Sequence, residues 1–202
     1  MRSIRCIFLD MGKVLLDFDF MRAAERMRTL TGCGPERLRS AITGGDLAVR
    51  FELGKIGKAE FRDEVCRLLG VQVPYDEFAS AWNSIFLETP ILPDATLAAL
   101  SRRAALWVLS NTNKLHFDFI EGNYSFLRHF TGRILSFEVG AMKPDYEIFD
   151  RALQKAEVNA EEALFVDDHR PNVEAALSIG IDSFQFLSRD QFTDEMKARD
   201  LL

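Results

Sequence analysis

The sequence predicts an α/β fold, in which a Rossmann-like parallel sheet core has a small helical domain inserted after its first strand. Two observations support this prediction. Short apolar runs alternate with helical patterns from residue 94 onward. Residues 20–87 contain helical patterns and no strand-like run. Alternating strands and helices favour crossover connections and a parallel sheet, so the purely helical segment is interpreted as an insert.

The first strand is predicted over Ile4–Leu9, a nearly continuous apolar run that ends at Asp10 and Gly12. Such a run is typical of a parallel strand that is covered on both faces. Similar runs occur at 104–109, 133–137 and 163–166, and one more at 183–187. Helical patterns are predicted between them, at 94–103, 145–156 and 172–179.

The insert shows four helical patterns, at 21–30, from Pro35 onward, at 59–69 and at 75–86. Gly32 and Gly70 follow two of them, and proline is favoured in the first turn of a helix. Pro90 and Pro93 mark the return to the sheet. We therefore predict a core domain at 1–16 and 91–202 and a helical domain at 17–90.

The bulk composition excludes several classes of protein. The chain has 202 residues and a formal net charge of −6, which disfavours a nucleic-acid or anionic-membrane partner. No apolar segment is long enough to span a bilayer, and the N-terminus lacks the pattern of a signal peptide. The three cysteines are scattered, without CxxC spacing, which favours a reducing cytoplasmic compartment. We expect a monomer or homodimer.

Polar residues follow four of the predicted strands: Asp10, Ser110 with Asn111, Lys143, and Asp167 with Asp168. The carboxyl ends of parallel strands form the edge of the sheet where ligands bind. Each feature alone has an ordinary explanation, as a turn residue, a loop start, a solvated lysine or a helix cap. The set of four indicates a catalytic site.

These residue types suit phosphoryl transfer. A carboxylate such as Asp10 can attack phosphorus and form an aspartyl phosphate. Because a phosphoryl group is anionic, the site needs cations, and Asp10 with Asp168 can hold Mg²⁺. Lys143 can supply a second positive charge. The Ser110 hydroxyl and the Asn111 backbone N–H can bind the phosphoryl oxygens.

Four segments resemble the motifs of haloacid dehalogenase superfamily hydrolases: Phe8–Asp17, Leu109–Thr112, Met142–Asp145 and Phe165–Ala176. Leu109–His116 and Met142–Asp145 resemble most closely the branch that contains α-glucose-1-phosphate phosphatases. The resemblance spans nearly the whole chain, and the insert is similar to the small helical cap of the family. It implies a Mg²⁺-dependent phosphatase that acts on a small phosphorylated metabolite, with a sugar phosphate favoured.

The resemblance also implies roles for individual residues. Asp10 corresponds to the nucleophile, and Ser110 and Lys143 to the residues that orient the phosphate and neutralise its charge. Asp168 corresponds to the acidic magnesium ligand, and Asp167 is expected to support the metal through water. Asn172 stands where other members have a further carboxylate.

The sequence departs from the family at Gly12. Most phosphatases of the superfamily have a second Asp there, which protonates the leaving group. The Gly12 backbone carbonyl can still bind magnesium, but general acid catalysis is typically worth ~10²–10⁴-fold. A sugar 1-phosphate has a leaving group that needs less protonation. His169, Lys13 and His116 are the side chains that we consider as replacements, with His169 the preferred one.

The insert is predicted to close over the site, with hinges near 16–19 and 89–93. We predict that the loop Arg50–Gly57 contacts the substrate and that Glu52 binds sugar hydroxyls; a polar linker explains the same residues equally well. Trp82 and Phe86 are assigned to the packing of the last helix of the insert. Two alternatives to a phosphatase remain: a 2-haloacid dehalogenase, which needs no magnesium, and a catalytically silent binding or regulatory module.

Overall fold

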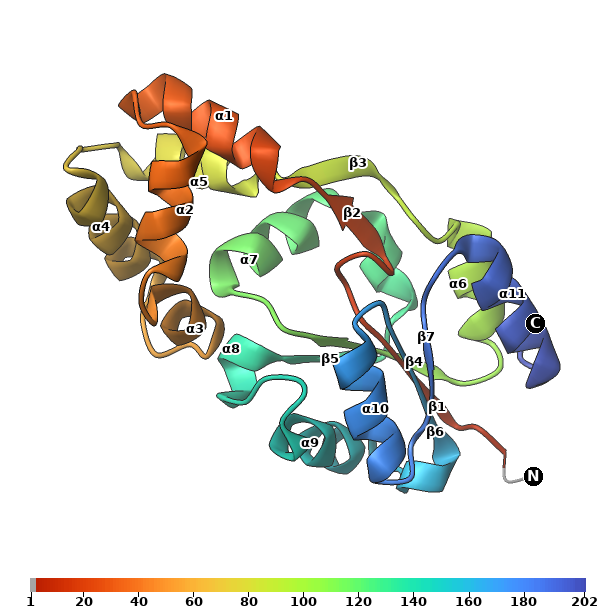
Figure 1. The fold of residues 1–202 in the computed structure, drawn as a ribbon. Coiled ribbons are helices and arrows are strands. Elements are labelled where there is room, and N and C mark those ends of the chain that lie inside the picture. The colour runs from red at the N-terminus through yellow and green to blue at the C-terminus, as the bar shows by residue number, and fades with distance from the viewer. Residues whose placement is uncertain (1–2) are drawn as a thin grey trace.

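The computed structural model describes residues 3–202 and has a parallel sheet of five strands at its centre (Figure 1). The strand order is β5–β4–β1–β6–β7, so the first strand of the chain is the middle strand of the sheet. The strands are β1 Cys6–Leu9, β4 Ala105–Ser110, β5 Gly132–Leu135, β6 Ala163–Asp167 and β7 Asp182–Gln185. The predicted α/β fold with a parallel sheet is confirmed. Residues 1 and 2, which begin the predicted core segment, lie outside the described residues.

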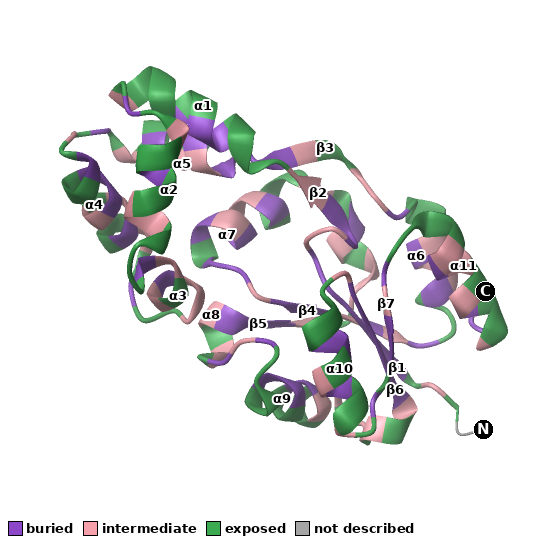
Figure 2. Ribbon diagram, in the orientation of Figure 1, coloured by how far each residue is buried: buried purple, intermediate pink, exposed green. Residues whose placement is uncertain are grey.

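The central strand is buried on both faces, as its continuous apolar sequence predicts (Figure 2). Ile7 and Leu9 pack into one hydrophobic cluster, and Cys6 and Phe8 pack into another on the opposite face. This division follows from the period of two along a strand. The first cluster includes residues of α6 Asp94–Leu100, α7 Lys114–Asn123 and α11 Arg189–Ala198, and the second includes residues of α9 Tyr146–Ala156 and α10 Arg170–Ser178.

Short elements complete the sheet region. They are α8 Ser136–Val139, η1 Ser125–His129 and η2 Ala160–Glu162. None of the helices in residues 3–202 has the length and hydropathy needed to cross a membrane.

Five helices lie between β1 and α6 and form the insert: α1 Phe20–Thr31, α2 Pro35–Thr43, α3 Leu47–Glu52, α4 Lys58–Leu69 and α5 Tyr75–Asn83. They enclose a hydrophobic cluster of their own, which contains Phe51, Phe61 and Phe78 and a single buried residue of the sheet region, Leu115. The predicted helix boundaries at Gly32 and Gly70 are confirmed, because both glycines have positive φ (72° and 69°) directly after a helix.

Two strands connect the insert to the sheet. β2 Leu16–Phe18 and β3 Phe86–Pro90 pair with each other as an antiparallel ribbon. Two backbone hydrogen bonds extend the pairing, from Asp19 N to the Ile85 carbonyl (2.8 Å) and from Ile91 N to the Leu15 carbonyl (2.8 Å). The two connections therefore form one structural unit.

Several predicted boundaries were wrong. The helix predicted over 75–86 ends at Asn83, and Phe86 belongs to β3, because it pairs with Phe18 of β2. Trp82 and Phe86 are thus not on one helix. The strand predicted over 133–137 ends at Leu135, because α8 begins at Ser136. The predicted loop at 50–57 begins inside α3, which continues to Glu52.

Candidate active site

The polar residues at the ends of three adjacent strands meet at one edge of the sheet. Asp10 directly follows β1, Ser110 is the last residue of β4, and Asp167 is the last residue of β6. β1 pairs in parallel with both β4 and β6, which places these positions side by side. A hydrogen bond from Asp10 N to the Val166 carbonyl (2.9 Å) continues the pairing as far as Asp10, the predicted nucleophile.

Lys143 lies between the carboxylates of this edge. Its Nζ is 2.8 Å from Asp10 Oδ1 and 2.6 Å from Asp167 Oδ2, and it donates to the Leu109 carbonyl at 2.9 Å. The side chain is almost wholly buried. Burial lowers the pKa of Lys143, but the charges of Asp10 and Asp167 outweigh this effect and raise it, so the ammonium stays protonated.

The loop that contains Lys143 is held by Asn111. The Asn111 side chain accepts from Lys143 N and donates to the Lys143 carbonyl, both at 2.8 Å. Next to it, the Ser136 hydroxyl accepts from Thr112 N and donates to the Thr112 carbonyl, both at 2.9 Å. The Asn111 side chain therefore fixes the lysine, and Ser136 fixes the loop after β4.

Asp167 is completely buried, and both of its carboxylate oxygens are engaged. Oδ1 accepts from His169 N at 2.7 Å, and Oδ2 accepts from Lys143 and from Asn172 Nδ2 (3.0 Å). Asp168 is less buried, and its carbonyl accepts from Gln185 Nε2 at 2.8 Å. Both carboxylate oxygens of Asp167 are thus engaged within the protein, whereas the Asp168 side chain is only partly buried.

Oxygens of Asp10, Asp167 and Asp168 lie within 4.8 Å of one another. Carboxylates at this spacing, with the Gly12 carbonyl in the same loop as Asp10, are the hard oxygen donors that suit Mg²⁺. The donor set fits a magnesium ion. Burial raises the pKa of Asp10 to about 6, and the Asp167 charge adds to the effect while Lys143 opposes it. A bound cation lowers this repulsion.

The Phe18 ring packs closely against Gly12. A Cβ built at Gly12 lies 2.8 Å from Phe18 Cε1, closer than side-chain atoms approach one another. Lys13 has a positive φ of 59°, and its Nζ lies over the Phe18 ring, 4.6 Å from the centroid. The same ammonium forms a short ion pair with Asp17. The three heavy atoms nearest to such a Cβ all belong to the Phe18 ring.

The three candidates for a replacement acid lie in different surroundings. Lys13 is paired with Asp17, as described above. His169 is exposed at the N-terminus of α10. His116 stacks on Trp82 of the insert (centroids 5.8 Å apart), and burial lowers its pKa to about 3. At neutral pH His116 is therefore an uncharged packing residue.

Glu52 lies at the C-terminal end of α3, half-buried, and burial raises the pKa of its carboxyl. Gly54, two residues later, touches the sheet region, since a Cβ there lies 2.2 Å from the Phe137 carbonyl in α8. The predicted substrate loop thus contacts the segment that follows β5.

Two residues of this region escaped the sequence analysis. Ser136 resembles any serine at a helix start, and its bonds to Thr112 depend on the pairing of β4 with β5. Phe18 follows Gly12 by six residues, and nothing in the sequence indicates that its ring returns to the glycine. Both relationships depend on loop geometry.

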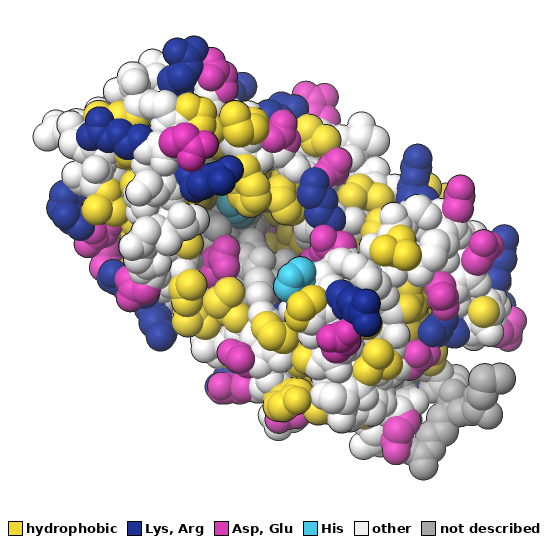
Figure 3. All heavy atoms as spheres, viewed as in Figure 1, with side chains coloured by type: hydrophobic (Ala, Val, Ile, Leu, Met, Phe, Trp, Pro, Cys, Tyr) yellow, Lys and Arg dark blue, Asp and Glu magenta, His cyan; other side chains and the backbone are white. Residues whose placement is uncertain are grey.

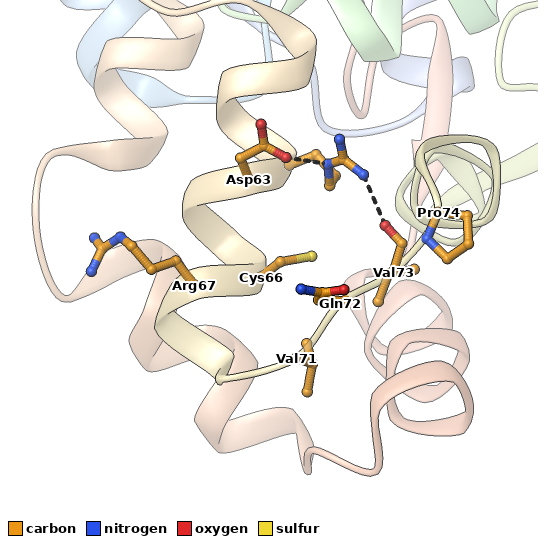
Figure 4. Close-up of a pocket in the computed structure, with 8 residues that line it drawn as sticks. Asp63, Cys66, Arg67, Val71, Gln72, Val73 and Pro74 are labelled. Carbon is orange, nitrogen blue, oxygen red and sulfur yellow. Dashed lines mark hydrogen bonds and ion pairs between the residues drawn. The ribbon is translucent and has the colours of Figure 1, made fainter.

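On the face of the molecule in Figure 3, a hollow separates the insert from the sheet region, and acidic and histidine side chains lie around it. A different hollow, of about 650 Å³, lies wholly on the insert beside α4 (Figure 4). There Arg62 Nε pairs with Asp63 (2.6 Å) and its guanidinium donates to the Val73 carbonyl (3.0 Å). This second hollow has none of the strand-end residues, so the candidate chemistry does not lie in it.

Comparison with known proteins identifies the family of this chain. The family model described as haloacid dehalogenase-like hydrolase matches residues 4–180. The chain belongs to the haloacid dehalogenase-like hydrolases. Membership confirms the superfamily resemblance and identifies the chain as a hydrolase.

Individual relatives are phosphatases. The chain is 27% identical to D-ribitol-5-phosphate phosphatase of Bacteroides thetaiotaomicron over 190 residues, 90% of this chain and 91% of that protein. It is 27% identical to the sesquiterpene phosphatase astK of Aspergillus oryzae, over 89% of this chain and 88% of the relative.

A solved structure is similar throughout. The haloacid dehalogenase family enzyme BT-2542 of Bacteroides thetaiotaomicron, in complex with magnesium and inorganic phosphate, superposes with a TM-score of 0.81. It is 26% identical and covers 93% of this chain and 96% of its own.

Proposed function

We propose that this chain is a Mg²⁺-dependent phosphatase that hydrolyses small phosphate monoesters, sugar phosphates foremost, through an aspartyl-phosphate intermediate. The observation that carries the proposal is the buried cluster in which Lys143 lies 2.8 Å from Asp10 while Asp10, Asp167 and Asp168 stay within 4.8 Å of one another. A fold does not need three carboxylates and a lysine crowded at one sheet edge, because their burial is costly. The phosphatase relatives support the same class of substrate.

Asp10 is the proposed nucleophile. Its carboxylate oxygen forms a bond to phosphorus while the bond from phosphorus to the ester oxygen breaks; the electron pair leaves on that oxygen, which takes a proton from solvent to form the alcohol. Water then attacks phosphorus and releases phosphate and free Asp10. Lys143 donates to Asp10 and offsets the negative charge that the phosphoryl group brings.

Ser110 and Asn111 are proposed to hold the phosphoryl oxygens, through the Ser110 hydroxyl and the Asn111 backbone N–H. The Asn111 side chain forms two hydrogen bonds with the Lys143 backbone. These bonds fix the Asn111 N–H and the Lys143 side chain relative to each other. Asp10, Asp168 and the Gly12 carbonyl are the proposed magnesium ligands, with Asp167 acting through water. The ion supplies positive charge that lowers the repulsion between Asp10 and the phosphate.

The helical segment at 17–90 is proposed as a cap that closes over this edge. Its helices surround a separate hydrophobic cluster, and the β2–β3 ribbon is its covalent link to the sheet region. Glu52 is proposed to bind substrate hydroxyls, because its half-buried carboxyl lies on the α3 segment whose following turn contacts α8. In this arrangement the cap determines the organic part of the substrate.

A hydrolysis screen tests the function. Sugar phosphates, alditol phosphates, nucleotides and p-nitrophenyl phosphate are assayed with Mg²⁺ and with EDTA. We expect Mg²⁺-dependent phosphate release that falls by at least about 10³-fold in Asp10→Asn. The matched control is Asp94→Asn, an exposed carboxyl on α6, which is expected to keep wild-type rates. Equal rates in Asp10→Asn and wild type would contradict the assignment of the nucleophile.

The same assay separates the two alternatives. Chloride release from 2-chloropropionate without Mg²⁺ would identify a dehalogenase. Absence of turnover with every ester and with the haloacid would favour a binding module.

A further inference from the structure

The two neighbouring aspartates at the end of β6 are held in different ways. Both carboxylate oxygens of Asp167 accept hydrogen bonds from other residues. The Asp168 carboxylate accepts one from its own backbone N–H and, within residues 3–202, none from another residue. The direction of the Asp168 side chain therefore depends on how the backbone of residue 168 is held.

That backbone is held from the neighbouring strand β7, an edge strand of the sheet (Figure 1). Asp167 and Gln185 are partners in the parallel pairing of β6 with β7. One residue further along each strand, Phe186 N donates to the Asp167 carbonyl at 2.9 Å. The Gln185 side chain reaches beyond this bond, and its Nε2 donates to the Asp168 carbonyl at 2.8 Å. A side-chain amide of β7 thus fixes the peptide group that follows the Asp168 side chain.

The end of β7 is held in turn by α11. Gln191, in the first turn of that helix, donates from Nε2 to the Gln185 carbonyl (3.1 Å) and accepts on Oε1 from Leu187 N (3.2 Å). The Ser188 hydroxyl accepts from Gln191 N (3.2 Å) and caps the helix at the same point. A chain of hydrogen bonds therefore runs from the start of α11 through the end of β7 to the Asp168 carbonyl.

We propose that Gln185 is a positioning residue for the metal site: its amide holds the backbone of Asp168, and through it the carboxylate that binds magnesium. Gln185 acts through Asp168 and is not itself a ligand in this account. Removal of a hydrogen-bond partner behind a metal ligand typically costs about 10–100-fold in metal affinity or activity. The inference rests on the proposed function, which assigns Asp168 as a magnesium ligand.

A purely structural role for Gln185 makes a different prediction. In that case the amide only satisfies a backbone carbonyl and ties an edge strand to the sheet. Its removal then lowers the stability of the fold and leaves the affinity for Mg²⁺ unchanged. The measurement that separates the two roles is therefore metal affinity, compared with a variant that weakens β7 elsewhere.

Calorimetric titration of Mg²⁺ into the full chain without substrate tests the proposal. Gln185→Met keeps the length of the side chain and removes the donor, so it is expected to raise the Kd for Mg²⁺ about 10-fold or more. The matched control is Ser183→Ala on the same strand, whose buried hydroxyl donates to the Ile181 carbonyl (3.1 Å) and does not touch the segment 167–169. The control is expected to bind Mg²⁺ like wild type, even if both substitutions lower the melting temperature. In a phosphatase assay, the Mg²⁺ concentration that gives half-maximal rate is expected to rise with the Kd of Gln185→Met.

Two results overturn the proposal: equal Kd values for Gln185→Met and wild type, or an equal loss of affinity in Ser183→Ala, which assigns the effect to the strand as a whole. If Gln185→Met does not fold, Gln185→Asn replaces it, because its amide is drawn back by one methylene and the same weakening is expected. The titration contains no ester. A wild-type protein that binds Mg²⁺ but hydrolyses no phosphate ester therefore refutes the proposed function, while the Kd values still decide the role of Gln185. A wild-type protein that binds no Mg²⁺ refutes both.

Discussion

Lys143 and Asp167 form an ion pair of 2.6 Å between side chains that are 1% and 0% exposed. The same ammonium bonds Asp10, so one cation serves two carboxylates, and these three side chains together have a net charge of −1. Burial of unbalanced charge is unfavourable, which is why the pKa of Asp10 is raised. A further cation at the site would therefore stabilise the ionised Asp10. Without it, burial of the excess negative charge lowers the stability of the fold.

Removal of Lys143 should cost more stability than removal of one of its partners. Lys143→Met leaves two buried carboxylates without a cation, and such a break is expected to lower the free energy of unfolding by about 3–5 kcal/mol. Asp167→Asn keeps the pair with Asp10 and should cost less. Urea unfolding at neutral pH with EDTA measures both. A Lys143→Met protein as stable as wild type would show that the buried cluster is not held together by the lysine.

Magnesium should stabilise the fold through the same cluster. A ligand at 100 times its Kd adds about 2.7 kcal/mol to the free energy of unfolding. We expect Mg²⁺ to raise the melting temperature of wild type and of Asp94→Asn, and to have little effect on Asp168→Asn. Thermal unfolding at several Mg²⁺ concentrations gives the comparison. Equal shifts in wild type and Asp168→Asn would remove Asp168 from the metal site.

His116 should make stability depend on pH. The Asn113 carboxamide oxygen accepts from His116 N, so its Nδ2 faces His116 Nδ1 (3.2 Å) and the imidazole proton is assigned to Nε2. Burial lowers the folded pKa to about 3 from an ordinary 6.5, so between these values the unfolded chain binds more protons. The stabilisation is complete above pH 6.5 and is lost as pH falls towards 3.

His116→Gln, which does not titrate, measures this effect. From pH 7.5 to pH 5.0 wild type is expected to lose about 1–2 kcal/mol more than the variant, allowing for the partial exposure of the ring. Chemical unfolding at the two pH values gives the difference. Equal losses in both proteins would mean that His116 is protonated in the folded state as readily as in the unfolded one.

Gly54 should be essential to the contact between the insert and the sheet region. Its φ is 68°, and an added Cβ lies 2.2 Å from the Phe137 carbonyl. Positive φ alone costs a non-glycine residue about 1–2 kcal/mol, and the overlap adds to it. Gly54→Ala is therefore expected to lower the free energy of unfolding by more than about 2 kcal/mol.

The matched control is Gly57→Ala, three residues along the same loop. Gly57 has a φ of −83° and no atom within 4 Å of an added Cβ. Gly57 is also the N-cap of α4, where glycine is favoured over alanine, so its substitution is expected to cost no more than about 1 kcal/mol. Equal effects of the two substitutions would mean that the loop adapts freely and that its contact with α8 is weak.

The positions of Asp10, Ser110 and Asp167 were predictable because a strand has few degrees of freedom. Once β1, β4 and β6 are parallel neighbours, their carboxyl ends meet. The helix predicted through Phe86 shows where pattern alone fails. Trp82 and Phe86 keep helical spacing, but pairing of Phe86 with Phe18 offers backbone hydrogen bonds across the ribbon and ends the helix at Asn83.

The relationships between side chains were not predictable. Lys143 is predicted to be a phosphate-binding cation, but its bond to Asp167 and the hydrogen bonds from Asn111 to its backbone depend on how two loops fold against each other. The same is true of Phe18 and Gly12, which are close because the chain turns back at 13–16. Periodicity contains no information on such turns.

The central place of β1 also has a consequence for synthesis on the ribosome. Residues 10–104 separate β1 from β4, and residues 10–162 separate it from β6. At ~5–20 residues per second, the strand emerges about 5–20 s before either neighbour can pair with it. The helices of the insert are complete within that interval and have most of their hydrophobic partners among themselves. Among the described strands, β1 is thus made before both of its neighbours, and its apolar side chains stay without their sheet partners until β4 and then β6 have been synthesised.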